Sequence, residues 1–211
     1  MKIIPQFVLD AFFPVRCVGC KQYDSWFCPR CLSQCKKSHP VSSLNGTWLD
    51  GWYAAGSYHN EKLAAAIHAL KYEAVIELAE PLAGLLIEVY RQSNWLIDVI
   101  VPVPLARLRQ RFRGYNQAAL LACLLADQIG LPAQEALERR YHTISQTELT
   151  ARGRQKNVAA CFGVKKGVTF NQKNVLLIDD VGTTGATLQE CAKVCKSAGA
   201  AEVYALTVAH G

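Results

Sequence analysis

The sequence lacks a long uncharged hydrophobic run, although 51% of its 211 residues are hydrophobic. Nowhere do about eighteen apolar residues follow one another without a charge, the length that a membrane-spanning helix needs. The apolar segment 1–15 is interrupted by Pro5 and Asp10, and no small-residue cleavage site follows it. It reads as a short amphipathic segment rather than a signal peptide. We therefore expect no membrane span and a cytoplasmic protein.

Acidic residues are missing from two stretches of the chain. Residues 99–126 contain four arginines and no acid, and residues 149–178 contain six lysines and arginines and no acid, whereas the net charge of the whole chain is only +6. Such local concentrations of positive charge predict an anionic ligand. A solvated basic face is the alternative that composition leaves open.

Internal repeats and low-complexity segments are absent as well, and the length suits one α/β domain with a small appendage. The apolar patterns predict strands at 52–58, 95–103, 158–164, 174–178 and 202–209, and helices at 60–72, 74–90, 115–129 and 184–198. This alternation predicts a doubly wound parallel sheet flanked by helices, with ligands at the carboxyl ends of the strands. The polar stretch 36–46 predicts a boundary between residues 1–46 and 47–211.

The most informative segment is 175–187, VLLIDDVGTTGAT, which joins a buried strand, two acids, a glycine- and threonine-rich turn and a helix. Free N–H groups and the positive dipole end at a helix start can hold a phosphate. Gly182 and Gly185 allow the backbone to approach a ligand closely. The adjacent carboxylates Asp179 and Asp180 suit ribose hydroxyls with Mg²⁺ nearby. The segment predicts a sugar-phosphate site; an acidic turn that only caps the helix is the alternative.

Four arginines alternate after the apolar segment 95–103: Arg107, Arg109, Arg111 and Arg113. In an extended loop they would project to one side. The planar guanidinium group suits bidentate contacts with phosphate. We therefore expect an anion site here, with a solvated basic loop as the alternative.

Nine cysteines are present, and without a secretion signal the expected compartment is reducing, where thiols stay free or bind metal. The first four form two CxxC pairs, Cys17 with Cys20 and Cys28 with Cys31. This spacing is typical of a Cys₄ zinc site, and Cys35 and His39 are nearby spare ligands. So small a segment needs such a staple to fold, which predicts a structural metal. A disulfide is the alternative.

The segment 175–187 resembles the signature by which type I phosphoribosyltransferases bind phosphoribosyl pyrophosphate (PRPP). The resemblance implies that Asp179 and Asp180 are the catalytic acids and hold the ribose 2′ and 3′ hydroxyls. It implies a PRPP-binding loop formed by Asp179, Asp180, Val181, Gly182, Thr183, Thr184, Gly185, Ala186 and Thr187, with the 5′-phosphate on the last five. It also implies that the four arginines hold pyrophosphate. The family usually has a hydrophobic residue in place of Gly182, so we expect a more flexible loop.

Further segments narrow the resemblance to the ComF family, over nearly the whole chain and including the cysteine-rich start. They are Pro102-Val-Pro104, Arg113-Gly-Tyr-Asn-Gln117 and the run 143–157 with Gln146, Arg154 and Asn157. In that family Gln146, Arg154 and Asn157 would form a hood over the site, and Lys71-Tyr72 resembles a position that faces it.

The resemblance implies a PRPP-binding, phosphoribosyltransferase-like protein that acts in natural competence and DNA uptake. As an enzyme it would be a glycosyltransferase that uses Mg²⁺, with an acceptor that the sequence does not identify. The alternative is a non-catalytic accessory factor of DNA uptake that binds single-stranded DNA or a nucleotide through the same fold. In that case a competence helicase is a further expected partner.

Overall fold

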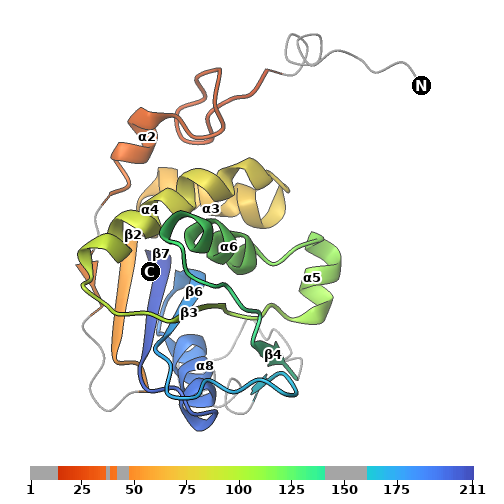
Figure 1. Ribbon diagram of the computed structural model, residues 1–211. Helices are drawn as coiled ribbons and strands as arrows, with labels where there is room; N and C mark the ends of the chain where they lie inside the picture. Colours follow the sequence, from red (N-terminus) through yellow and green to blue (C-terminus); the bar gives the residue numbers. More distant parts are fainter. Residues whose placement is uncertain (1–13, 37–38, 42–47, 141–160) are drawn as a thin grey trace.

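The protein is built around a mainly parallel sheet (Figure 1). The computed structural model describes residues 14–36, 39–41, 48–140 and 161–211. Five strands lie in the order β1 (His39–Pro40), β2 (Gly51–Ser57), β7 (Val203–His210), β6 (Val175–Gly182) and β3 (Val99–Pro102). β1 is antiparallel to β2, and the other neighbours are parallel. The carboxyl ends of four strands therefore meet at one edge.

Helices cover both faces of this sheet (Figure 1). One face carries α3 (Glu61–Tyr72), the 3₁₀ turn η1 (Ile76–Leu78), α4 (Ala79–Gln92) and α6 (Gln117–Ile129); the other carries α8 (Ala186–Ser197). Successive residues of a strand point to opposite faces, and accordingly Leu176 and Ile178 pack with the first layer while Val175 and Leu177 pack with α8. The predicted parallel sheet flanked by helices is confirmed.

Two helices of the first layer, α3 and α6, begin at asparagine caps. Asn60 caps α3 by accepting hydrogen bonds from the N–H groups of Lys62 and Leu63, both at 3.1 Å. Asn116 caps α6 in the same way, and α6 ends at Gly130 with a positive φ of 71°. Among the described residues, no helix combines the length and the apolar character needed to cross a bilayer.

Two predicted elements differ from the structure. The helix expected at 74–90 begins only at Ala79, because Ala74 takes a left-handed conformation with φ 55° and η1 follows it. The strand expected at 95–103 is shorter in the structure, where β3 covers only Val99–Pro102.

One further pair of strands was only partly foreseen. β4 (Leu137–Arg139) pairs antiparallel with β5 (Phe162–Val164), and the two lie on either side of residues 141–160. The sequence predicted a strand near β5 but none at β4, because three residues are too few to show a periodicity.

The cysteine-rich segment packs on the first helical layer, above α3 and α4 in Figure 1. It contains a turn closed by a bridge between Arg16 and Tyr23 and the short helix α2 (Pro29–Ser33). Phe27 and Cys35 join the same buried cluster as α3 and α4. A side chain at Gly19 would meet the side chains of Cys31 and Lys62 at 3.0 to 3.3 Å, so the two parts are in close contact.

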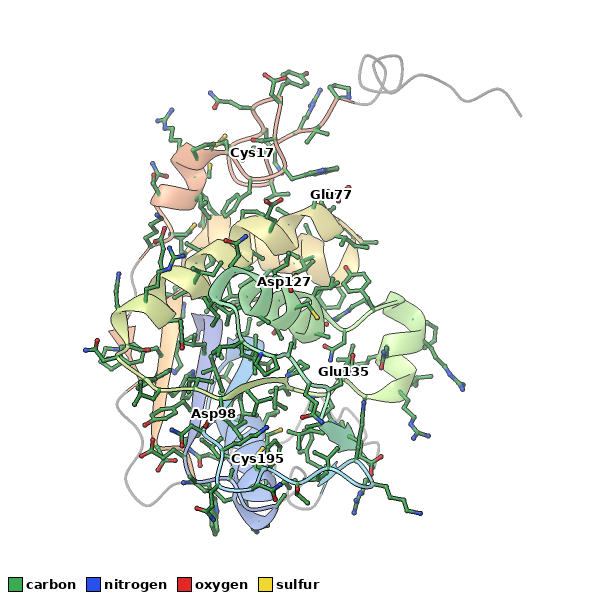
Figure 2. The ribbon with its side chains drawn as sticks, viewed as in Figure 1. Cys17, Glu77, Asp98, Asp127, Glu135 and Cys195 are labelled. Carbon is green, nitrogen blue, oxygen red and sulfur yellow. The ribbon has the colours of Figure 1, made fainter. Side chains whose placement is uncertain are left out.

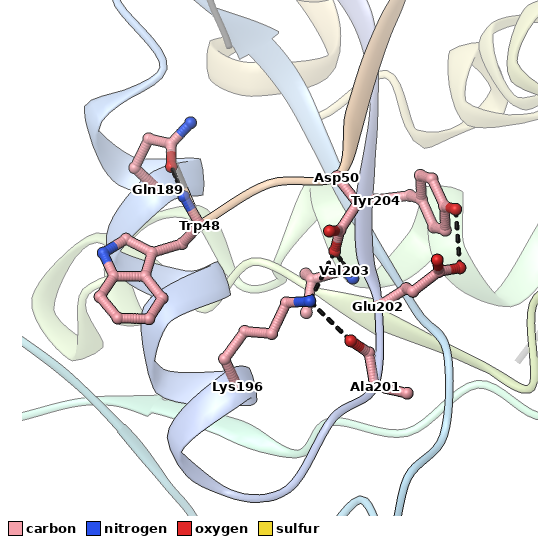
Figure 3. A network of polar contacts seen from close by, with 8 residues as sticks. All are labelled: Trp48, Asp50, Gln189, Lys196, Ala201, Glu202, Val203 and Tyr204. Carbon is pink, nitrogen blue, oxygen red and sulfur yellow. Dashed lines mark hydrogen bonds and ion pairs between the residues drawn. The ribbon is translucent and has the colours of Figure 1, made fainter. Parts of the chain in front are cut away.

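The amino end of the sheet is tied to α8 by polar contacts (Figure 3). Asp50, just before β2, accepts a hydrogen bond from the N–H of Val203 and forms an ion pair with Lys196 of α8, both at 2.7 Å. The N–H of Trp48 donates to Gln189 of α8 at 2.8 Å. The ion pair with Lys196 holds the end of α8 that lies farthest from the turn at its start, and Gln189 provides a contact in the first half of the helix.

Candidate functional site

The acidic pair lies within the last part of β6, at the edge where the parallel strands end. Because side chains alternate along a strand, Asp179 and Asp180 lie on opposite faces of the sheet. Asp180 forms an ion pair with Lys71 of α3, and Asp179 is influenced by the positive charge of Arg139 of β4. The pair therefore joins two groups of cations that are far apart in sequence.

Asp180 is the most unusual polar residue of this edge. Its side chain is only 6% exposed, and its Oδ1 atom lies 2.7 Å from Lys71 Nζ. Its buried Oδ2 atom has no hydrogen-bond partner among the residues that the structure describes. An unsatisfied buried carboxylate oxygen costs free energy, so this atom needs a hydroxyl group or a cation. The resemblance singled out Lys71 as facing the site, and the structure places it beside Asp180.

Asp179 is partly buried and accepts a hydrogen bond from the N–H of Asp180 at 2.8 Å. Burial raises the pKa of Asp179 to about 8, and the adjacent charge of Asp180 adds to the rise, while Lys71 and Arg139 oppose it. At neutral pH this carboxyl group is therefore largely protonated. A cation bound at the pair would favour its ionised form.

This raised pKa predicts a pH dependence of stability. Between 3.8 and about 8 the folded protein retains the proton of Asp179 that the unfolded chain has lost. The free energy of unfolding should therefore fall as the pH rises through this window and level off above it. We expect Asp179→Asn to flatten this slope, measured by urea denaturation across the range. The exposed carboxyl of Asp127 (Figure 2) supplies the control, and an Asp127→Asn variant that flattens the slope equally would contradict the assignment.

The predicted phosphate turn follows directly. Thr183 and Thr184 are exposed, and Gly185 precedes α8 with a positive φ of 72°. Their N–H and hydroxyl groups thus lie at the start of a helix of 12 residues, as a phosphate site requires. The last residues of the chain support the turn from behind, because His210 Nε2 lies 3.1 Å from the carbonyl oxygen of Thr183.

Trp52 of β2 lies beneath this turn. It is buried, its indole N–H donates to Thr207 at 3.1 Å, and its ring meets His210 edge-on at 5.3 Å. A side chain at Gly182 would overlap the indole, and one at Gly185 would come within 2.8 Å of it. Sequence reasoning connected Gly182 with flexibility; the structure gives a different reason for the glycine, which is space for Trp52.

We expect Gly182→Ala to destabilise the protein by about 1–3 kcal/mol, the usual cost of overpacking a core. Gly84 of α4 is the matched control, because nothing lies within 4 Å of a side chain added there. Gly84→Ala should be neutral or stabilising, since alanine favours a helix interior by up to about 1 kcal/mol. Denaturant midpoints measure both. Equal midpoints for wild-type and Gly182→Ala protein would contradict the close packing.

The four arginines do not lie in an extended loop, so the expectation that they project to one side is wrong. Residues 107–113 form the helix α5 (Arg107–Arg113), which ends at Gly114 with a positive φ of 84°. The segment RLRQRFR contains good helix formers and no glycine or proline, which explains the helix. At about 100° per residue the arginines divide into two sets: Arg107 and Arg111 on one side, Arg109 and Arg113 on the other.

Each side of α5 borders its own cleft. The first, of about 240 Å³, lies beside the end of β3 and is lined by Arg107 and Gln110 together with Arg139 and Lys165. The second, of about 430 Å³, lies between α5 and the end of α3. Its lining residues are Lys71, Tyr72, Ala74, Arg109, Phe112 and Arg113.

Sequence reasoning missed Arg139. This side chain is partly buried, and its guanidinium group lies 5.4 Å from the centre of the Phe162 ring. Burial lowers its pKa, and its charge in turn lowers the pKa of Asp179. The only signal was a pair of arginines near the end of an unrecognised strand. The predicted hood residues Gln146, Arg154 and Asn157 lie outside the described residues.

The four cysteines of the two CxxC pairs come together. Their sulfur atoms all lie within 4.8 Å of one another, and the sulfurs of Cys20 and Cys28 are 3.6 Å apart. A tetrahedral zinc ion with Zn–S bonds of about 2.3 Å separates its sulfur ligands by roughly 3.8 Å, so this group can hold a metal ion. Burial raises the pKa of the Cys17 thiol, but backbone N–H groups, that of Cys28 first, outweigh it and bring the pKa to about 6.

Cys35 stands apart from this group. Its buried thiol donates to the carbonyl oxygen of Cys31 at 3.2 Å and to Asn60 Oδ1 at 3.6 Å. Burial raises its pKa to about 11. The side chain of His39, the other spare ligand, lies outside the description. In the part of the chain that the structure describes, no cysteine forms a disulfide.

The fold and the site together define an α/β protein that presents an acidic pair and a phosphate-type turn at the carboxyl edge of a parallel sheet. It carries in addition a cysteine cluster able to hold a metal ion. No family model matches the chain.

The chain is 32% identical over 206 residues to competence protein F of Haemophilus influenzae, covering 89% of this chain and 86% of that protein. It therefore belongs to the ComF family. It is 31% identical over 195 residues to the DNA utilization protein YhgH of Escherichia coli, covering 89% and 85%. With competence protein ComFC of Streptococcus pneumoniae the identity is 28% over 188 residues, covering 89% and 77%.

Solved structures of phosphoribosyltransferases are more distant. Adenine phosphoribosyltransferase of Trypanosoma brucei has 14% identity and a TM-score of 0.43, covering 84% of this chain and 65% of that one. The PRPP amidotransferase of B. subtilis has 20% identity and a TM-score of 0.45, covering 63% and 27%.

Proposed function

We propose that this protein binds PRPP with Mg²⁺ at the carboxyl edge of its sheet and acts in DNA uptake as a phosphoribosyltransferase of the glycosyltransferase class. The observation that carries the proposal is the buried, unpartnered Oδ2 atom of Asp180, which lies on the strand that leads into the exposed Thr183-Thr184 turn. A ribose hydroxyl or a bound cation would satisfy this oxygen, and the turn would hold the phosphate of the same ligand.

Each part of PRPP can be assigned to one part of the site. Asp179 and Asp180 would hold the ribose hydroxyls, and Thr183 to Thr187 the 5′-phosphate. Pyrophosphate would lie in the first cleft, where Arg107 and Arg139 supply positive charge beside the end of β3; Lys165 also lines it but is paired with Glu135, and Glu138 is a second acid of the lining. Cations that stabilise the charge developing on pyrophosphate favour its departure from the ribose.

The residues at the acidic pair also fit Mg²⁺, which prefers carboxylate and phosphate oxygens. Asp179 and Asp180 would hold the ion together with oxygens of the ligand. When bound, the ion neutralises negative charge on pyrophosphate. A bound ion would lower the raised pKa of Asp179, so ion binding should release a proton from this carboxyl group.

The role in DNA uptake is supported by the names of the relatives, which include competence proteins and a DNA utilization protein. A second candidate follows from the same names: an accessory factor that binds single-stranded DNA or a nucleotide without catalysis, with a competence helicase as partner. The exposed arginines of α5 favour it as well. Release of pyrophosphate from PRPP separates the two, because a binding protein releases none.

Titration with PRPP and with single-stranded DNA tests the proposal. We expect Arg107→Ala to weaken PRPP binding by about 1–3 kcal/mol, the cost of losing a charge-assisted hydrogen bond. If Arg107 serves DNA instead, PRPP binding should stay unchanged and the salt dependence of DNA binding should become shallower. Wild-type protein that binds PRPP no more tightly than ribose 5-phosphate or pyrophosphate alone would contradict the proposed function.

We propose further that Cys17, Cys20, Cys28 and Cys31 hold one structural zinc ion per chain in a cytoplasmic protein. Two observations support this proposal. The four sulfur atoms lie close together, and a segment as short as residues 14–36 cannot form a sufficient core of its own. Residues 1–46 would then form the zinc-binding part and 47–211 the phosphoribosyltransferase-like domain.

A further inference from the structure

The second cleft has a lining that the PRPP site does not use. It lies between the end of α3 and one side of α5, and its lining among the described residues has three cations, two aromatic rings and no acid. On α5 the positions 109, 112 and 113 share one side of the helix. Arg107, Gln110 and Arg111 share the other and border a different opening.

The aromatic rings of this cleft are unusually exposed. Phe112 is 85% exposed and Tyr72 is 68% exposed. The Tyr72 ring is held in place, since the guanidinium group of Arg113 lies 5.2 Å from its centre and the ring of His68 lies at 4.9 Å. A ring held in place and a second, exposed ring in the same cleft offer flat apolar surface to a planar ligand.

The cations of the cleft favour a negative charge on that ligand. Arg113 is oriented by a hydrogen bond to Gln117, and Lys71 is held by Asp180. Arg109 forms no ion pair within the described part of the chain. Among the described residues no carboxylate lines the cleft, so Arg109 and Arg113 keep their charge there, whereas Lys71 is paired with Asp180. An arginine fork beside an aromatic surface suits a ring that carries a carboxylate or a phosphate.

Lys71 connects this cleft to the acidic pair. It lines the cleft, and its Nζ atom lies 2.7 Å from Asp180 Oδ1. A ligand in the cleft is therefore next to the place proposed for the ribose, on the side of the sheet away from the pyrophosphate cleft.

We propose that this cleft binds the acceptor, and that the acceptor is a small planar aromatic or heteroaromatic molecule with an anionic substituent. The inference rests on the proposed function. In the transfer, a nucleophilic atom of the acceptor forms a bond to ribose C1 while the bond from C1 to pyrophosphate breaks. The electron pair leaves with pyrophosphate, and the proton that the nucleophile loses passes to water.

Two matched pairs of probes test the charge: nicotinate with nicotinamide, and orotate with uracil. We expect the anionic member of at least one pair to bind about tenfold more tightly than its neutral partner, the effect of one charge-assisted hydrogen bond. Phe112→Ala and Arg109→Ala should each weaken it about tenfold. Arg111→Ala removes the same charge from the opposite side of α5 and should leave probe binding unchanged, as measured by calorimetry without PRPP.

The inference would be overturned by equal binding of the neutral probes, by an equal loss in Arg111→Ala, or by binding of an oligothymidine alone with dependence on Phe112. The last would make the cleft a nucleic-acid site. PRPP binding, measured on the same proteins, separates this failure from that of the proposed function. If PRPP binds and no anionic probe does, only the acceptor assignment is wrong; if PRPP does not bind either, the proposed function fails first.

Discussion

Replacing Asp180 by asparagine is expected to abolish the rise in melting temperature that PRPP and Mg²⁺ give to the wild-type protein. A ligand that binds only the folded state stabilises it by about 2.7 kcal/mol at a hundred times its Kd. Asparagine keeps the shape of the side chain but loses the negative charge that would attract a cation. It also lacks the second carboxylate oxygen, so it cannot accept hydrogen bonds from two ribose hydroxyls through two oxygens. Thermal denaturation with and without ligand measures the shift.

The substitution should leave the fold intact, because it removes a charge whose buried oxygen has no partner in the described structure and which helps to raise the pKa of Asp179. It also removes the ion-pair partner of Lys71, so the melting temperature of the variant without ligand must be measured as its own reference. Asp127→Asn makes the same change at an exposed position of α6 and should keep the full shift. If Asp180→Asn, alone or combined with Asp179→Asn, still responds to PRPP, the ribose assignment is wrong.

Replacing Cys31 by serine is expected to remove the metal and unfold residues 14–36. Metal binding by isolated zinc-finger peptides supplies on the order of 10 kcal/mol of folding free energy, and the other buried contacts of this segment are those with the first helical layer. Cys31 is fully buried, so a serine there also places a hydroxyl group in the core. Elemental analysis measures the metal, and hydrogen exchange measures the loss of protection by segment.

The loss of protection should extend into the first turn of α3, because Cys35 and Gln34 bond to the capping residue Asn60. The strands of the parallel sheet should stay protected. Cys123→Ser, on the exposed side of α6, is the control and should retain about one metal ion per chain, as the Cys₄ arrangement predicts. The assignment of a structural metal would be contradicted if metal-free wild-type protein still protected residues 14–36 from hydrogen exchange.

The features that could be predicted from the sequence are formed by residues that lie close to one another along the chain. The strand, acidic pair, turn and helix of 175–187 follow one another along the chain, and each has a local signal. The two CxxC pairs come together within a short segment for the same reason. The caps Asn60 and Asn116 likewise mark helix starts through their own side chains.

The contacts between distant segments could not be predicted in this way. The ion pair between Lys71 and Asp180 depends on how α3 packs against the sheet, and local pattern carries no information about that. Arg139 reaches the site from a strand too short to show a period. The alternating arginines were compatible with an extended loop, and helix propensity rather than alternation decided their arrangement.

The position of Trp52 makes the protein its own optical probe. Its indole lies against Gly182 and Gly185, so any ligand that shifts this turn changes the surroundings of one buried fluorophore. The other three tryptophans, Trp26, Trp48 and Trp95, are at least partly accessible to water. With these three changed to phenylalanine, the emission of Trp52 would report the arrival of a phosphate in real time, without a label and without any knowledge of the reaction that follows.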